Sequence, residues 1–99
     1  MPSSDWWVYM LLCENNTYYT GYTNNLTKRY QAHLAGKGSK YTRSFKPISI
    51  AKSWKIPGGK CDAMKAERSI KKLTRQEKEK IVHADHDQWL LHFTSENLP

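Results

Sequence analysis

Tyrosines are concentrated near the start of the chain, in the stretch WVYMLLCENNTYYTGYT that spans residues 7–23. A phenol can hold or pass a proton, but its ordinary pKa near 10 makes it a poor base unless nearby cations lower that pKa. Tyrosines in strands more often pack against neighbours and leave their hydroxyl in water. The stretch by itself leaves both interpretations open.

Arg29 and His33 are four residues apart and would be neighbours on one face of a helix. Arginine suits a phosphate, because its guanidinium is a planar fork of donors that stays charged. The plainer alternative is an exposed arginine–histidine pair without a role.

Glu67 lies at the margin of an apolar stripe on a second predicted helix, formed by Ala63, Ala66, Ile70 and Leu73. A carboxylate turned partly toward the sheet costs desolvation unless a positive group such as Arg29 or a metal ion compensates it. Alternatively, Glu67 turns outward and pairs with Lys71 one helical turn later.

The chain is basic, with 16 Lys and Arg against 9 Asp and Glu, a net charge of +7 and a pI near 9.5. Such an excess favours a polyanionic partner. The loop GKGSKYTRSFKP combines cations with rings that can stack on unpaired bases, although Tyr41 and Phe45 could equally be core residues. The predicted nucleic-acid contacts are Lys28, Lys37, Lys40, Tyr41, Arg43 and Lys46.

These candidate groups need a scaffold, and alternation predicts a strand over Trp6–Cys13 followed by a second strand over Thr17–Tyr22. A two-residue loop, Asn15-Asn16, would place Tyr9 on the face of Tyr18, Thr20 and Tyr22. A three-residue loop from Glu14 to Asn16, with Asn16 in the left-handed conformation, would place Tyr9 with Tyr19 and Gly21 instead. The sequence does not choose between the two registers.

The remaining pattern predicts helices and one further strand. Asn24 or Asn25 caps a helix to about Ala35 with Leu26, Tyr30 and Leu34 as its core stripe, and Gly36 stops it. A strand follows over Ile48–Trp54, and Pro57-Gly58-Gly59 ends it. Helices are then expected over Asp62–Leu73 and, from a capping box at Thr74–Glu77, to about Val82, with a last amphipathic segment over Asp87–Phe93.

The whole pattern predicts an α+β fold in a single domain spanning residues 1–99, with a core over about 6–82 and a helical C-terminal extension over 83–99. Cys13 and Cys61 show no spacing typical of zinc or redox pairs, and no segment resembles a signal peptide or a membrane span. We therefore expect a cytoplasmic protein with reduced thiols and no membrane partner.

Taken together, Tyr9 closing WVY, YTG at residues 19–21, Arg29, His33 and Glu67 resemble the GIY-YIG nuclease superfamily. The chain is most similar to small stand-alone bacterial members, which are similar to the nuclease domain of the Slx-type endonucleases. The resemblance runs from about Trp6 to Ile81, and its densest part is YTGYTNNLTKRYQAH followed by GKGSKYTR.

The resemblance implies a three-stranded antiparallel sheet flanked by helices, an active site on one sheet face, and hydrolysis of DNA phosphodiester bonds with one Mg²⁺ or Mn²⁺ ion. By the same resemblance Tyr9 activates or positions the attacking water and Tyr19 supports it. Arg29 holds the scissile phosphate, His33 assists by hydrogen bonding, and Glu67 binds the metal ion.

Some positions depart from the family pattern. Trp7 replaces a glycine, Thr20 replaces an isoleucine, and EKEKIV lacks the asparagine that larger members carry after the metal-binding glutamate. Two functions remain open: an endonuclease for branched, flapped or single-stranded DNA, or a weak or inactive nucleic-acid-binding module of the same fold. We expect little sequence specificity unless a protein partner supplies it.

Overall fold

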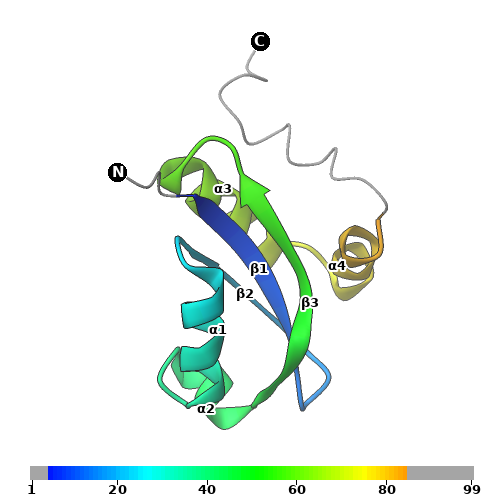
Figure 1. The fold of residues 1–99 in the computed structure, drawn as a ribbon. Coiled ribbons are helices and arrows are strands. Elements are labelled where there is room, and N and C mark those ends of the chain that lie inside the picture. The colour runs from blue at the N-terminus through cyan, green and yellow to red at the C-terminus, as the bar shows by residue number, and fades with distance from the viewer. Residues whose placement is uncertain (1–4, 85–99) are drawn as a thin grey trace.

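The computed structural model describes residues 5–84 and shows a three-stranded antiparallel sheet flanked by helices (Figure 1). The strand order is β2-β1-β3, so that the first strand is central and both of its neighbours are edge strands. The elements are β1 (Trp6–Cys13), β2 (Tyr18–Thr23), α1 (Leu26–Leu34), α2 (Lys40–Ser44), β3 (Pro47–Ile56), α3 (Lys60–Lys71) and α4 (Arg75–Val82).

The hairpin turn inside the Cys13–Thr17 pair has three residues, Glu14–Asn16, which decides the register that the sequence left open. Cys13 and Thr17 close the turn by a backbone hydrogen bond, and Asn16 adopts a φ of 64°. Asparagine tolerates this left-handed conformation better than most residues. Tyr9 consequently lies opposite Gly21.

One face of the sheet is covered by α1 and α2 (Figure 1). Tyr9, Leu11 and Cys13 of β1 are buried there against Leu26 and Tyr30 of α1 and Tyr41 of α2, with Tyr19 and Ile50. The N-cap of α1 is Asn25, whose side chain accepts a hydrogen bond from the Lys28 amide.

Two expectations for this face are wrong. Leu34 does not belong to the core, because 41% of its surface is exposed at the last residue of α1. The basic segment 36–47 is also not entirely loop: Ser39 caps the short helix α2 by accepting from the Thr42 amide. A single helical turn is too short to produce a readable apolar stripe in the sequence.

The other face is covered by α3 and α4. Ala63, Ala66 and Ile70 recur at helical spacing on α3 and pack against Val8 and Met10. The helix begins two residues before the predicted Asp62 and ends at Lys71. The predicted capping box at α4 is confirmed, since Thr74 and Glu77 each bond the other's backbone amide.

The hairpin is tied to α4 by Arg75. Its guanidinium lies 4.5 Å from the centroid of the Tyr18 ring and donates a hydrogen bond to the carbonyl oxygen of Asn16. This contact joins two segments that are far apart in the sequence. The expected amphipathic segment 87–93 lies outside the described residues, and no helix within 5–84 has the length and apolarity of a membrane span.

Candidate active site

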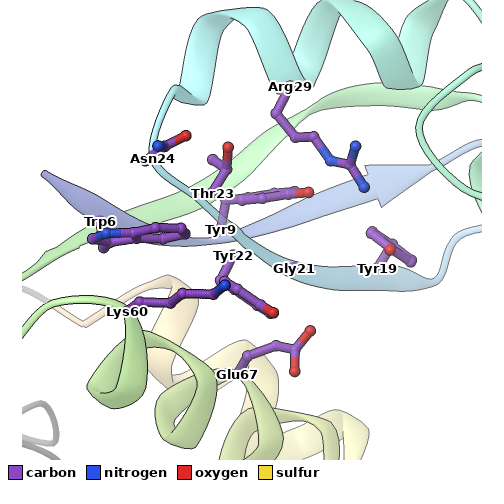
Figure 2. A pocket seen from close by; sticks show the side chains of 10 residues that line it. All are labelled: Trp6, Tyr9, Tyr19, Gly21, Tyr22, Thr23, Asn24, Arg29, Lys60 and Glu67. Atoms are coloured by element: carbon purple, nitrogen blue, oxygen red, sulfur yellow. The ribbon is translucent and has the colours of Figure 1, made fainter. Parts of the chain in front are cut away.

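A pocket lies along the edge strand β2, between α1 and α3 (Figure 2). Its volume is about 340 Å³, within the range of pockets that hold small ligands. Residues of both sheet faces contribute, so the site is not confined to one face as the resemblance implied. Its lining consists of Trp6, Tyr9, Tyr19, Gly21, Tyr22, Thr23, Asn24, Arg29, Lys60 and Glu67.

Tyr9 reaches this pocket because its strand neighbour is a glycine. Gly21 lies directly opposite Tyr9, and a Cβ atom added at Gly21 would be 2.5 Å from the Tyr9 hydroxyl oxygen. The Tyr9 ring can therefore lie across β2 only while residue 21 has no side chain. Only 1% of the Tyr9 surface is exposed, yet the residue lines the pocket.

His33 lies behind Tyr9 and is fully buried. Its Nε2 atom is 2.8 Å from the Tyr9 hydroxyl, and its Nδ1 atom is 2.7 Å from Oγ1 of Thr42, which is itself fully buried. Thr42 Oγ1 lies 2.9 Å from the hydroxyl of Ser39. The alternative of an exposed Arg29–His33 pair is thus wrong for His33.

The donors of this network can be assigned from what each group is able to do. The Arg29 guanidinium is close enough to Tyr9 for its positive charge to lower the pKa of the phenol, and a guanidinium has no lone pair that could accept the phenol proton. We therefore assign the Tyr9 proton to the hydrogen bond with Nε2 of His33, which leaves the lone pairs of the Tyr9 oxygen on the side of Arg29. A neutral imidazole that accepts at Nε2 carries its proton on Nδ1, which donates to Thr42.

Burial shifts the pKa of both groups toward their neutral forms. Desolvation raises the pKa of Tyr9 to about 12, against a smaller lowering by the Arg29 hydrogen bond. Desolvation and the charge of Arg29 lower the pKa of His33 to about 4. At neutral pH the pair is consequently a neutral phenol hydrogen-bonded to a neutral imidazole.

Arg29 is fixed by the segment that follows α1. Its Nη2 atom donates a 2.9 Å hydrogen bond to the carbonyl oxygen of Gly38. Gly38 also borders His33, because a Cβ atom at that position would overlap the imidazole ring. Since a guanidinium has five N–H donors, Arg29 keeps donors for a phosphate after it binds Gly38.

Glu67 faces the pocket from α3 and also forms the ion pair that the sequence offered as its alternative role. Its carboxylate is 3.3 Å from the Lys71 ammonium, and 18% of the Glu67 side chain is exposed. Within residues 5–84 no three His, Cys, Asp or Glu side chains form a metal-binding group. A single pocket carboxylate fits Mg²⁺ or Mn²⁺, which retain water ligands and bind substrate phosphate.

Tyr19 lines the pocket and is held by ring contacts. Its centroid is 5.1 Å from that of His33 and 6.0 Å from that of Tyr41, with a stacked arrangement in the second case. The Tyr41 hydroxyl bonds Thr17 and Asn15 of the hairpin turn. Tyr41 is thus engaged in packing, whereas Phe45 is 38% exposed.

The predicted basic contacts lie on or beside α1 and α2. Lys28 is on α1, Lys40 and Arg43 are on α2, and all three are exposed. Lys37 and Lys46 are exposed in the segments before and after α2. None of these five cations lines the pocket, so any contribution to binding concerns more distant parts of a substrate.

Sequence reasoning missed several residues at this site. Ser39 and Thr42 lie inside the motif GSKYTR but bear no signal of a hydrogen bond to a histidine on another helix. Lys60 and Tyr22 line the pocket through the meeting of α3 with β2. A helical wheel extended back from Glu67 by seven residues would have placed Lys60 on the same face.

The chain matches the family model described as the GIY-YIG catalytic domain over residues 5–80. It is 44% identical over 84 residues to a UPF0213 protein of Bacillus velezensis, covering 83% of this chain and 82% of that one. A UPF0213 protein of Neisseria meningitidis serogroup A is 43% identical over 84 residues, with 82% and 88% covered.

A solved structure agrees with these relatives. The solution NMR structure of a UPF0213 protein from Bacillus halodurans matches with a TM-score of 0.53 and 36% identity, covering 87% of this chain and 90% of that one. The similarity in sequence extends over both halves of the pocket, from β1 to α4. The chain therefore belongs to the GIY-YIG nuclease family, as a small member similar to the UPF0213 proteins.

Proposed function

We propose that this protein is a divalent-metal-dependent endonuclease that hydrolyses DNA phosphodiester bonds. The observation that supports this most strongly is that Tyr9, Arg29 and Glu67, from three different elements, line one pocket. A phenol, a guanidinium and a carboxylate are the groups needed to handle a water, a phosphate and a cation.

In the proposed reaction a water oxygen attacks the phosphorus atom while the bond from phosphorus to one sugar oxygen breaks. The water proton passes to the Tyr9 oxygen as the Tyr9 proton moves to Nε2 of His33, along the 2.8 Å hydrogen bond. Solvent protonates the leaving sugar oxygen. His33 is neutral at physiological pH, so its Nε2 lone pair is free to accept, but its pKa of about 4 makes it a weak base that needs the negative charge of a bound phosphate to hold the proton.

Negative charge on the phosphate oxygens is stabilised from two sides of the pocket. Arg29 offers fixed donors whose position is set by the Gly38 carbonyl, which avoids reorganisation during reaction. Tyr19 presents a further hydroxyl at the same pocket and supports the water. A divalent ion held by Glu67, Mg²⁺ or Mn²⁺, would supply additional positive charge at these oxygens.

The proposed substrates are branched, flapped or single-stranded DNA, as for the Slx-type domains that the sequence resembles. We propose little sequence readout by this chain alone, with a protein partner as its source where readout occurs. The second candidate function is a DNA-binding module with weak or no turnover. Its support is the Tyr9 pKa of about 12, which makes the phenol a poor base without added positive charge.

The test is cleavage of labelled flap, junction, single-stranded and duplex DNA with Mg²⁺, with Mn²⁺ and with EDTA. We expect metal-dependent cleavage that falls by about 100-fold or more in Arg29→Ala and Glu67→Gln, with DNA binding retained in Glu67→Gln. Lys55→Gln, at an exposed lysine outside the pocket, is the matched control. Binding without cleavage under every metal would support the module, and equal cleavage by all variants would indicate a contaminant.

A further inference from the structure

The pocket continues past the groups used in the proposed chemistry. Trp6 at the start of β1, Tyr22 on β2 and Lys60 at the start of α3 line an arm of the same pocket, on the side away from Tyr19 (Figure 2). Figure 2 shows Lys60 extending along this arm beneath Trp6, toward Tyr22. The proposed hydrolysis gives these three residues no role.

Two of the three are aromatic rings that meet each other. The centroids of Trp6 and Tyr22 are 6.0 Å apart with an angle of 39° between the ring planes. Each ring packs partly against the core formed by Val8 and Met10 and is half-buried. Each therefore combines a fixed position with ring surface at the pocket, as a stacking platform for a nucleobase requires.

The third residue supplies positive charge beside the rings. The Lys60 ammonium lies 5.7 Å from the Trp6 ring centroid, near the outer limit of a cation–π contact. Among residues 5–84 no carboxylate forms an ion pair with Lys60, whereas Glu67 on the same helix is paired with Lys71. The charge of Lys60 is thus left for a ligand.

The pocket as a whole then has two cations and, at the end that holds Lys60, two aromatic rings (Figure 2). Arg29 contributes from α1 and Lys60 from α3, while Trp6 and Tyr22 come from the sheet. Two cations together with aromatic rings in one pocket match the combination of phosphates and a base in a segment of nucleic acid. A ligand with one anionic group alone would use only one end of such a pocket.

We propose that Trp6, Tyr22 and Lys60 form a nucleotide subsite that binds the nucleotide next to the scissile phosphate. The base of that nucleotide stacks on Trp6, and its outer phosphate contacts Lys60. This inference rests on the proposed function for the position of the scissile phosphate at Arg29. It goes further in assigning a base contact, which requires the neighbouring base to be free of its pairing partner.

The direct probe is thymidine 3′,5′-bisphosphate, which carries one base between two phosphates. Binding is measured in EDTA by titration of the Trp6 indole N–H signal, assigned from its loss in Trp6→Leu, and by calorimetry. The comparison ligand is 1,2-dideoxyribose 3′,5′-bisphosphate, which keeps both phosphates and lacks the base. Neither ligand requires turnover, so the result does not depend on the protein being active.

We expect the Trp6 signal to shift with the nucleotide, and the comparison ligand to bind about tenfold more weakly. Trp6→Leu should lower affinity for the nucleotide about tenfold and leave affinity for the base-free ligand unchanged, whereas Lys60→Gln should weaken both. Trp7→Leu and Lys55→Gln serve as controls, since neither residue lines the pocket.

The two ligands separate stacking from a folding defect, because a misfolded Trp6→Leu protein would lose affinity for both. Equal binding of the two ligands by the wild-type protein, or an unshifted Trp6 signal, would overturn the subsite. If DNA is cleaved and Trp6→Leu still binds both ligands normally, the subsite fails and the proposed function stands. If the nucleotide binds through Trp6 but no DNA is ever cleaved, the proposed hydrolysis fails and the subsite stands.

Discussion

The hydroxyl of Tyr9 lies 2.8 Å from Nε2 of His33, in a buried hydrogen bond between the central strand and a helix 24 positions later. With the tyrosine proton assigned to this bond, the lone pairs of the Tyr9 oxygen are left toward Arg29 and the pocket. Nε2 of His33 can accept this proton only while Nδ1 carries the imidazole proton. Nδ1 is hydrogen-bonded to Thr42 of α2, so Thr42 belongs to the same hydrogen-bond network.

The tautomer of His33 is therefore expected to depend on Thr42. Thr42→Val keeps the shape but removes the acceptor at Nδ1, and we expect cleavage to fall at least tenfold and stability to fall by ~1–3 kcal/mol. Thr42→Ser should restore both. The ¹⁵N shifts of the His33 ring report the tautomer directly. Similar losses in the valine and serine variants would show that Thr42 acts only through packing.

Gly21 is expected to tolerate no side chain. In Gly21→Ala the new methyl group would overlap the Tyr9 hydroxyl, so that the ring must move off β2 and cleavage should fall by about 100-fold. The comparison is Ser53→Ala, at the residue that pairs with Tyr9 from the other edge strand. Retained cleavage in Gly21→Ala would mean that the Tyr9 hydroxyl is not needed at its present position.

Acid should destabilise the fold through His33. Its pKa falls from 6.5 to about 4 on folding, so between these values the unfolded chain binds a proton that the folded protein excludes. The contribution of neutral His33 to the free energy of unfolding is fully present above pH 6.5. It is lost as pH falls toward 4, by at most ~1.4 kcal/mol per pH unit. Urea unfolding of wild type and His33→Gln across this range checks it, and parallel pH profiles would contradict the assignment.

The basic residues around α2 should govern the salt dependence of DNA binding. Replacing Lys37, Lys40, Arg43 and Lys46 by glutamine should reduce the slope of log K against log salt by ~0.7 for each lost phosphate contact with a single strand. Fluorescence anisotropy at several salt concentrations measures the slope. Lys72→Gln with Lys80→Gln, on exposed positions beside or on α4, is the control; an equal change there would indicate diffuse binding by net charge.

The capping box should stabilise α4 without affecting catalysis. Thr74→Ala removes the acceptor for the Glu77 amide and should lower the free energy of unfolding by ~1 kcal/mol. Gln76→Ala, an exposed neighbour inside the helix, should change it by a few tenths of that amount. Thermal and urea unfolding measure both, and a larger effect of Gln76→Ala would contradict the capping role.

Much of the fold was predictable because its signals are local. Alternation over Trp6–Cys13 gave the bounds of β1, and Thr74 with Glu77 marked the start of α4. Leu34 was wrongly assigned to the core. Helical spacing identifies the apolar face of α1, but it does not show how far along the helix that face is covered by the sheet. The helix α2 was missed because one turn of polar residues carries no periodicity.

The residues of the candidate site were predictable only as a set. Tyr9, Tyr19, Arg29, His33 and Glu67 came from the family resemblance, and the structure brings them together at β2. Their mutual arrangement could not be predicted, because it depends on tertiary contacts such as His33 with Thr42 and Arg29 with Gly38. Residues from both sheet faces line one pocket at the edge strand β2, and this too follows from tertiary packing and not from sequence spacing.

The turn Glu14–Asn16 influences the pocket although none of its residues lines the pocket. Side chains alternate between the sheet faces, so removing one turn residue would shift β2 by one position along β1. The β2 side chains that now face α1 would then face α3, and the reverse. Tyr22 would then face α1 and Gly21 would no longer lie against Tyr9. The length of a distant surface turn thus decides which side chains surround the proposed position of the scissile phosphate.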